Sequence, residues 1–347
     1  MVQVQWGRDL IRSWTRNGWV DLPQRVGDKI GRIIGAAPGQ VLVADSTSVN
    51  LFKLLAAALP LRPDRKVILS DRGNFPTDLY IARGLATLLG GYELRVVEED
   101  RILQSIDSDV ALVMLTQVNY RSGLLHDLAA MTATAQAAGA LMLWDLSHST
   151  GALPVDLDAA KADFAVGCGY KYLNGGPGAP SYLYVAQRHQ DQVRPALAGW
   201  FSHAAPFDFD LEYRPADGIR RNLSGTPGIL GLTALEVAVD LMLEVDQQAL
   251  RQKSIKLCET FIARVEAECG NHFEIASPRD AARRGSQICL RHPAAGEIVQ
   301  KLIDQQVIPD FRPPDIVRCG FAPLYTSFGD LGRAVAVLKQ VGRELAG

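Results

Sequence analysis

The stretch WDLSHSTGALPVDLDAAKADFAVGCGYKYLNGGPGAP, at residues 144–180, indicates both the fold and the chemistry of this chain. It sets Asp145 at the end of one apolar run, LMLWD, and Lys171 just beyond a second, ADFAVGCG. Short and almost wholly apolar runs are typical of strands that are buried on both faces of a parallel sheet. We therefore expect strands of one sheet to deliver Asp145 and Lys171, with a glycine-rich turn directly behind the lysine.

Short apolar runs alternate with helical patterns throughout the first half of the chain. The strand patterns before residue 141 are VLVAD (41–45), KVILSD (66–71), ELRVVE (93–98) and VALVML (110–115). Helical patterns lie between the strands at 50–59, 77–89 and 127–138. Strands that are separated by helices form a mostly parallel sheet with helices on both faces. The sequence therefore predicts an α/β fold.

The ends of the chain have a different pattern. Residues 8–35 have helical spacing broken at Gly18 and Pro23, which predicts two helices. Apolar residues at helical spacing run from 229 to 267, which indicates one or two long helices. Beyond residue 273, the strand patterns QICLRH and IVRCGF flank a helical pattern, as in a small α+β domain.

These patterns predict three parts. We expect residues 1–38 to be an N-terminal helical segment that packs with the small domain, and residues 39–228 to be a large cofactor-binding domain. Residues 229–347 would contain a long linking helix and the small C-terminal α+β domain.

The composition argues against several classes of partner. A formal net charge of -2, with Lys+Arg 36 against Asp+Glu 38, provides no basic excess for a nucleic acid. Five cysteines without a CxxC pair predict reduced thiols rather than disulfides or zinc ligands, and we expect no metal. The chain has no apolar stretch of membrane-spanning length and no signal-peptide pattern at its N-terminus, so we expect no membrane partner and a cytoplasmic location.

Asp145 and Lys171 together fit an enzyme that uses pyridoxal phosphate. Such enzymes need a lysine that forms a Schiff base with the cofactor and a carboxylate that pairs with the pyridinium nitrogen. Burial would lower the pKa of the lysine and leave its amine free to attack an aldehyde. His148, three residues after Asp145, would reach the phosphate or the substrate carboxylate, or would be a buried histidine bonded to backbone.

Two other strand ends carry polar side chains. Asp45-Ser46-Thr47-Ser48 closes one strand and opens a helix, so it is either a phosphate site or an ordinary helix cap. In the segment 74–78, Phe75 would cover one face of a flat cofactor and Asp78 would orient polar groups. The alternative is that Thr77 caps the next helix and Phe75 packs in the core. Thr116, after VALVML, is a candidate hydrogen-bond donor.

Longer strings in the chain resemble the kynureninase family, which are fold type I, aspartate-aminotransferase-like pyridoxal phosphate enzymes. The matching strings are DSTSVNLFK, NFPTDLY, NYRSGLLHD, WDLSHSTGALPVDL, CGYKYLNGGPGAP, LAGWFSH, SGTPGI and IPDFRPPDIVRCGFAPLYTSF. They cover nearly the whole chain in the expected order, and GYKYLN is not shared by fold type I enzymes in general.

The resemblance implies a role for each matching residue. Lys171 would hold the cofactor, and Tyr170 would carry protons in the later steps. The implied cofactor-binding residues are Thr47, Ser48, Phe75, Asp78, Thr116, Asp145, His148, Tyr170, Lys171, Trp200 and Thr226. Trp200 and Thr226 would act across a homodimer interface. Arg318 would clamp the substrate's α-carboxylate, with Arg312 as second choice, and Trp19 would lie near the aromatic end of the substrate.

The implied reaction is hydrolytic cleavage of L-kynurenine, or of 3-hydroxykynurenine, in tryptophan catabolism and NAD biosynthesis. The products would be anthranilate, or 3-hydroxyanthranilate, and L-alanine. Another fold type I reaction, such as cysteine desulfuration or transamination, is an alternative. A second alternative follows because family members usually begin with several dozen further residues, whereas this chain begins at MVQVQWGRDL. A truncated relative could bind the cofactor and be catalytically impaired.

Overall fold

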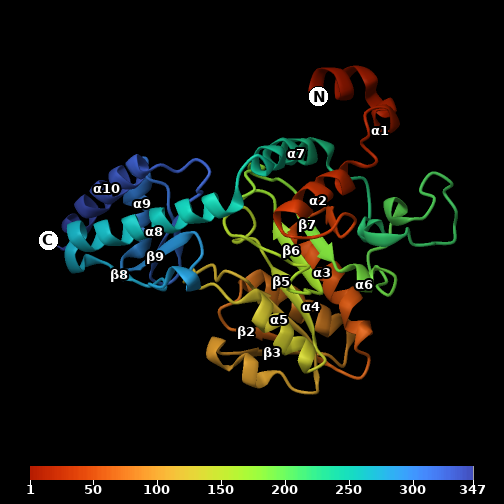
Figure 1. The fold of residues 1–347 in the computed structure, drawn as a ribbon, viewed down its shortest axis with the longest axis horizontal. Helices are drawn as coiled ribbons and strands as arrows, with labels where there is room; N and C mark the ends of the chain where they lie inside the picture. The colour runs from red at the N-terminus through yellow and green to blue at the C-terminus, as the bar shows by residue number, and fades with distance from the viewer. Residues whose placement is uncertain (347) are drawn as a thin grey trace. The chain divides into compact units, whose positions relative to one another are not determined.

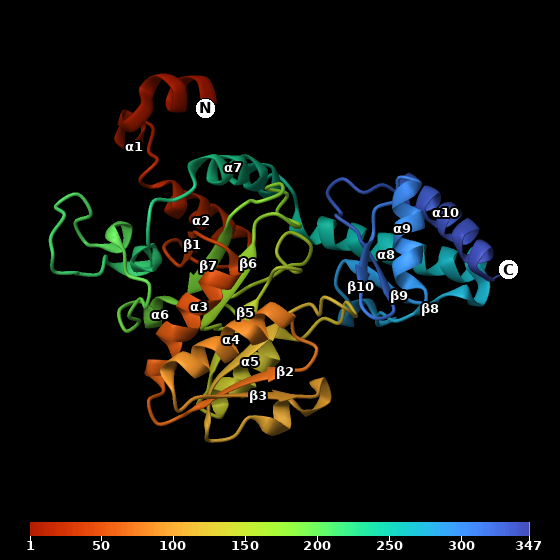
Figure 2. The same cartoon turned by 180° about the vertical axis from the view of Figure 1, so that it is seen from behind.

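A computed structural model describes residues 1–346, and they form two compact units. The first unit contains residues 1–116, 128–150 and 155–244. The second unit contains residues 117–127, 151–154 and the chain from residue 245 onwards. The two units are described separately below, and Figures 1 and 2 show the elements of each.

A seven-stranded sheet forms the centre of the first unit. Its strands are β1 (Val41–Val43), β2 (Val67–Asp71), β3 (Glu93–Val97), β4 (Val110–Thr116), β5 (Leu141–Asp145), β6 (Phe164–Cys168) and β7 (Ser181–Val185). They lie in the order β1-β7-β6-β5-β4-β2-β3. The five strands from β6 to β3 are parallel, whereas β7 is antiparallel to both of its neighbours. The predicted α/β fold with a mostly parallel sheet is confirmed.

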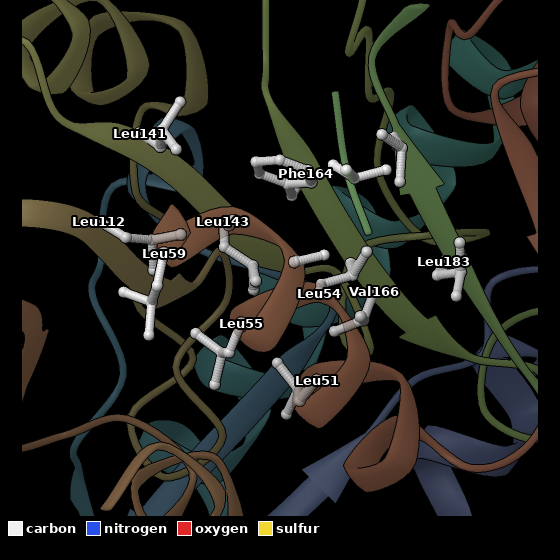
Figure 3. Close-up of a cluster of buried hydrophobic side chains, with 14 of the residues drawn as sticks. Leu51, Leu54, Leu55, Leu59, Leu112, Leu141, Leu143, Phe164, Val166 and Leu183 are labelled. Atoms are coloured by element: carbon white, nitrogen blue, oxygen red, sulfur yellow. The ribbon is translucent and has the colours of Figure 1, made fainter. Parts of the chain in front are cut away.

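Seven α-helices belong to the first unit, and several of them pack against the strands of this sheet. They are α1 (Ser13–Arg16), α2 (Leu22–Ile33), α3 (Thr47–Ala58), α4 (Pro76–Leu89), α5 (Leu128–Ala137), α6 (Gln187–Gln190) and α7 (Ile229–Leu243). Helix α3 contacts β6, β7 and α4, while α5 packs on β5 and α2 packs on both β1 and α7. Figure 3 shows how Leu51, Leu54 and Leu55 of α3 lie over side chains of the central strands, such as Leu143 and Val166. This apolar stripe, with its three- and four-residue spacing, seats α3 on the sheet.

The N-terminal helices begin at different places from those predicted. Pro23 was expected to interrupt a helix, but it lies in the first turn of α2. The first turn tolerates proline, because an amide there has no partner within the helix. Gly18, with a φ of 66°, does separate α1 from α2.

The second unit is a small α+β assembly with its own core. Its elements are α8 (Gln247–Cys269), β8 (Glu274–Ile275), β9 (Gln287–Arg291), α9 (Ala295–Asp304), β10 (Asp310–Arg312), β11 (Ile316–Gly320) and α10 (Phe328–Ala346). The four strands form an antiparallel sheet in the order β10-β11-β9-β8. The long helical pattern at 229–267 is thus two helices, of which α7 belongs to the first unit and α8 to the second.

Two further observations concern the classes of partner that the composition argued against. All five cysteines are free thiols, and only Cys319 is partly exposed. Within residues 1–346, every helix is too short or too polar to span a lipid bilayer.

Candidate active site

The carboxyl ends of β4, β5 and β6 bring residues that were predicted to bind the cofactor to one edge of the sheet. In the strand register, Thr116 is paired with Asp145, and Asp145 is paired with Val166, two residues before the end of β6. Ligands of open α/β sheets gather at this edge, where loops and helix N-termini converge. A cavity of about 850 Å³ lies here, entirely within the first unit.

Nine of the residues predicted for the site line this cavity. They are Thr47, Ser48, Phe75, Asp78, Asp145, His148, Tyr170, Lys171 and Thr226. They come from five separate segments of the first unit, and the sheet and its helices place them together. Sequence reasoning did not single out three hydroxyl residues that also line the cavity, Ser147, Ser181 and Ser224. Of these, Ser147 and Ser224 stand in the quoted strings WDLSHSTGALPVDL and SGTPGI, so the sequence could have indicated both.

Two buried carboxylates, Asp78 and Asp145, interact electrostatically inside the cavity. Asp78 is 1% exposed and Asp145 is 3% exposed, and Asp145 also accepts a hydrogen bond from the backbone N–H of Ser147 at 2.8 Å. Burial, followed by the negative charge of Asp145, raises the pKa of Asp78 well above its usual value, while Lys171 lowers it.

The carboxylate pair fits a cationic ring nitrogen. Within residues 1–346, the buried Oδ2 of Asp78 has no hydrogen-bond partner. A buried polar atom without a partner is costly, and a protonated pyridine nitrogen beside the pair would supply both a donor and a positive charge. The residues of this cavity therefore fit the ring of pyridoxal phosphate.

Tyr170 and Lys171 follow β6, which ends at Cys168, and they lie later in the 144–180 stretch than Asp145. The Nζ of Lys171 lies 5.5 Å from the centre of the Tyr170 ring. Burial raises the pKa of Tyr170 to about 12, so its phenol keeps its proton at neutral pH. An amine and a protonated phenol are thus adjacent in the cavity, as a reaction that moves protons near a carbonyl would need.

Glycines allow the chain around Lys171 to fold back closely. A Cβ added at Gly169 would collide with the carbonyl oxygen of Pro180 and would approach the Leu235 side chain to 2.9 Å. At Gly175, an added Cβ would lie only 2.8 Å from the Ala179 side chain. Glycine at these two positions therefore permits the close approach of the chain around Lys171.

Hydroxyl groups and a helix N-terminus form another wall of the cavity. Ser46 caps α3 by accepting a hydrogen bond from the N–H of Val49 at 3.4 Å, and Thr47 and Ser48 occupy the first turn. The Thr47 hydroxyl contacts Ser181 Oγ at 3.3 Å. The amides and the positive end of a helix dipole bind anions well. The helix-cap alternative is correct for Ser46, and the same turn is also suited to a phosphate group.

Phe75 lies at the N-cap position of α4 and faces the cavity. Both parts of the alternative interpretation of this segment were wrong, because Phe75 is 37% exposed and the structure shows no side-chain cap for α4. The Asn74 side chain holds the turn, since its Oδ1 accepts from the N–H of Phe75 at 2.7 Å and from the Thr116 hydroxyl. Thr116 is buried and does not line the cavity, so in this structure it supports the Phe75 turn from behind.

Four other predicted residues do not line this cavity. Trp200 stacks with Phe209 in the first unit, with ring centres 6.3 Å apart. Trp19 donates from its indole nitrogen to the Gln5 side chain at 3.1 Å. In the second unit, Arg318 is 8% exposed and binds both carboxylate oxygens of Asp310, from Nε at 2.8 Å and from Nη2 at 2.5 Å. Arg312 also donates to Asp310, at 3.0 Å.

Comparison with known proteins agrees with this geometry. The family model described as "Kynureninase C-terminal domain" matches residues 250–338. The kynureninase of Deinococcus radiodurans is 52% identical over 349 aligned positions, which cover 99% of this chain and 85% of that protein. The kynureninase of Pseudomonas fluorescens is 46% identical, over 98% of this chain and 84% of that protein.

Solved structures with the same fold are more distant in sequence. A cysteine desulfurase from Thermococcus onnurineus, in its apo form, has a TM-score of 0.82 at 19% identity and covers 94% of this chain and 85% of its own. A mutant of C-DES, with glycine covalently linked to its PLP cofactor, has a TM-score of 0.82 at 17% identity and covers 94% of this chain and 87% of its own. These likenesses establish the fold type I architecture. The identity to the bacterial kynureninases, which extends over nearly the whole chain, shows that this chain belongs to the kynureninase family.

Proposed function

We propose that this protein uses pyridoxal phosphate to hydrolyse L-kynurenine, a small-molecule substrate, to anthranilate and L-alanine. The observation that carries this proposal is the 52% identity to a kynureninase over 99% of the chain. The cavity supports it, because a buried carboxylate pair, an amine and a hydroxyl-lined helix N-terminus are all present within one unit. Cysteine desulfuration is not favoured, since the desulfurase likeness at 19% identity concerns the fold alone.

We assign the cofactor's three parts to three sides of the cavity. Asp145 and Asp78 would hold the ring nitrogen, because burial and then the negative charge of Asp145 raise the pKa of Asp78, and a cation beside the two carboxyl groups would offset that charge. Phe75, exposed to the cavity, would lie against a face of the ring. The α3 N-terminus, with Thr47 and Ser48, would hold the phosphate.

Pyridoxal phosphate, when bound, supplies an aldehyde that captures amines and a ring that accepts the electron pair released at the substrate's Cα. The Nζ of Lys171 would hold the aldehyde before substrate arrives and would then take the Cα proton. Water would add to the side-chain ketone at Cγ, so that this carbon leaves as the carboxyl group of anthranilate when the bond between Cβ and Cγ breaks. The phenol of Tyr170 would deliver a proton to the β-carbon. Its pKa of about 12 supports this role, since the group stays protonated at neutral pH.

Two further assignments rest on the family resemblance. Arg318 would bind the substrate's α-carboxylate, for which a planar guanidinium is suited. Trp200 would complete the site of a neighbouring subunit in a homodimer, whereas Thr226, for which the resemblance implies the same role, lines the cavity of its own subunit. Aromatic side chains around Trp200 are exposed, including Phe207 at 53% and Phe209 at 75%, and a second copy of the chain would cover them.

The proposed reaction is tested by incubating the cofactor-loaded protein with L-kynurenine and, separately, with 3-hydroxykynurenine. We expect equimolar L-alanine and the fluorescent anthranilate, or 3-hydroxyanthranilate from the hydroxylated substrate. Comparing kcat/KM for the two substrates identifies the preferred one. Sulfide released from cysteine, in the absence of either aromatic product, would refute the proposed reaction. Cofactor binding without any turnover would instead favour an impaired relative.

A further inference from the structure

Lys53 is a buried cation that joins two distant segments of the first unit. Its side chain is 2% exposed, and its Nζ donates to Asp45 Oδ2 at 2.5 Å and to the carbonyl oxygen of Asn222 at 2.8 Å. A lysine is rarely buried to this degree unless its charge is paired. Lys53 does not line the cavity, so its role must be sought in what its two partners hold.

Both partners of Lys53 stand at the start of a segment that lines the cavity. Asp45 leads into Ser46–Ser48, which form the cap and first turn of α3. Asn222 leads into the segment 223–228, all of which lines the cavity. Lys53 itself belongs to α3, so one ammonium group links the helix, the turn before it and the 223–228 segment. The helix and the turn before it form the wall that we assign to the cofactor's phosphate, and the 223–228 segment lines the same cavity.

The charge of Lys53 also matters for an anion in this cavity. Asp45 lines the cavity, and 36% of its side chain is exposed. An unpaired carboxylate at that position would repel a phosphate dianion. The ion pair at 2.5 Å offsets that charge, and it holds Asp45 in a backbone conformation with a φ of 49°, which is unusual for a residue other than glycine.

We propose that Lys53 is a positioning residue for the phosphate end of the cofactor. It aligns the 45–48 turn with the 223–228 segment and neutralises Asp45, without touching the cofactor. This inference rests on the proposed function, because it takes the ligand to be pyridoxal phosphate. It makes a selective prediction: loss of Lys53 weakens the binding of the phosphate, while the ring and aldehyde contacts at Asp145 and Lys171 are retained.

The test compares pyridoxal phosphate with pyridoxal, which has the same ring and aldehyde but no phosphate. Dissociation constants are measured for wild type and Lys53→Met from the visible circular dichroism that the bound aldehyde acquires. We expect Lys53→Met to lose affinity for pyridoxal phosphate by about 10- to 100-fold, the size seen when residues behind a metal's ligands are removed. The affinity for pyridoxal should stay within about two-fold of wild type. An equal loss for both ligands, or no loss for either, would overturn the inference.

Two further variants separate this effect from general destabilisation. Lys29→Met removes another lysine of the first unit, one that pairs with Glu236 and Asp240 and does not line the cavity, and it should leave both affinities unchanged. The double variant Lys53→Met with Asp45→Asn removes the buried pair together, which proteins tolerate better than the loss of one partner. It should bind pyridoxal phosphate better than Lys53→Met but less tightly than wild type, and wild-type affinity would overturn the inference.

Failure of this inference can be told apart from failure of the proposed function. A wild-type protein that binds no pyridoxal phosphate, or that does not cleave kynurenine when loaded, contradicts the proposed function. A wild-type protein that binds and cleaves, combined with a Lys53→Met variant that treats the two ligands alike, contradicts only the role of Lys53.

Discussion

Asp78 and Asp145 are two buried carboxyl groups that interact at the cavity, and burial, followed by the negative charge of Asp145, raises the pKa of Asp78 well above its usual value. A carboxyl group whose pKa is raised by folding stabilises the folded state at low pH. That stability is lost as the pH rises through the raised value, since the folded protein must then hold two neighbouring buried charges. The pair therefore makes the cofactor-free protein less stable at neutral and higher pH, and a bound cation would relieve this.

The first prediction concerns the variant Asp78→Asn. Without cofactor, this variant should unfold at a temperature a few degrees above wild type at pH 8, because one buried charge is gone. The difference should shrink as the pH falls through the raised pKa of Asp78, and it should vanish below about 4, where the carboxyl is protonated in both the folded and the unfolded protein. Thermal scans at several pH values, monitored by far-ultraviolet circular dichroism, measure this. The same variant should bind pyridoxal phosphate more weakly, and a variant that is both less stable and tighter in binding would contradict the assignment.

A second prediction concerns Lys171. Replacement by alanine should reduce turnover by at least about 10²- to 10⁴-fold, the contribution of a positioned acid or base, while the fold is retained because the side chain is only half-buried. Anthranilate fluorescence measures the rate. Lys256→Ala, at an exposed position on α8, is the matched control and should keep wild-type activity. Equal rates in both variants would exclude Lys171 from the reaction.

Sequence patterns located the central strands well, because parallel strands buried on both faces have a simple apolar signature. Asp145 and Lys171 were placed at the correct strand ends for the same reason. The pattern did not reveal β7, which follows directly after the glycine-rich turn and begins with Ser181. Without β7, the antiparallel pairing of β1 with the rest of the sheet could not be predicted.

The less predictable parts of the site depend on long-range contacts. Thr116 and Asn74 are 42 residues apart, and their contact turns Thr116 from a candidate ligand into a support for Phe75. Lys53 and Asn222 are 169 residues apart, and no local pattern indicates their hydrogen bond. At Pro23 a local pattern was present but had two meanings. Proline breaks a helix in its interior but is tolerated in the first turn, and the sequence alone does not say where the helix begins.

The third prediction separates cofactor binding from proton transfer at Tyr170. The variant Tyr170→Phe should bind pyridoxal phosphate with nearly wild-type affinity, because its ring and packing are kept. Its kcat should fall by about 10²- to 10⁴-fold, since the proton donor is lost. Stopped-flow measurement of kynurenine binding and anthranilate release locates the affected step. Full turnover by this variant would remove Tyr170 from the mechanism.

The last prediction uses two glycines with opposite surroundings. At Gly169, an alanine methyl would collide with the Pro180 carbonyl and crowd Leu235, so Gly169→Ala should destabilise the protein by about 1–3 kcal/mol, as overpacked substitutions do. Since Gly169 lies two residues before Lys171, cofactor affinity should fall as well. Gly84 is exposed within α4 and has open space around it, so Gly84→Ala should stabilise by about 0.5–1 kcal/mol. Urea unfolding of the two variants measures both signs, and a stable Gly169→Ala variant with unchanged affinity would show that the close turn beside Lys171 is not needed.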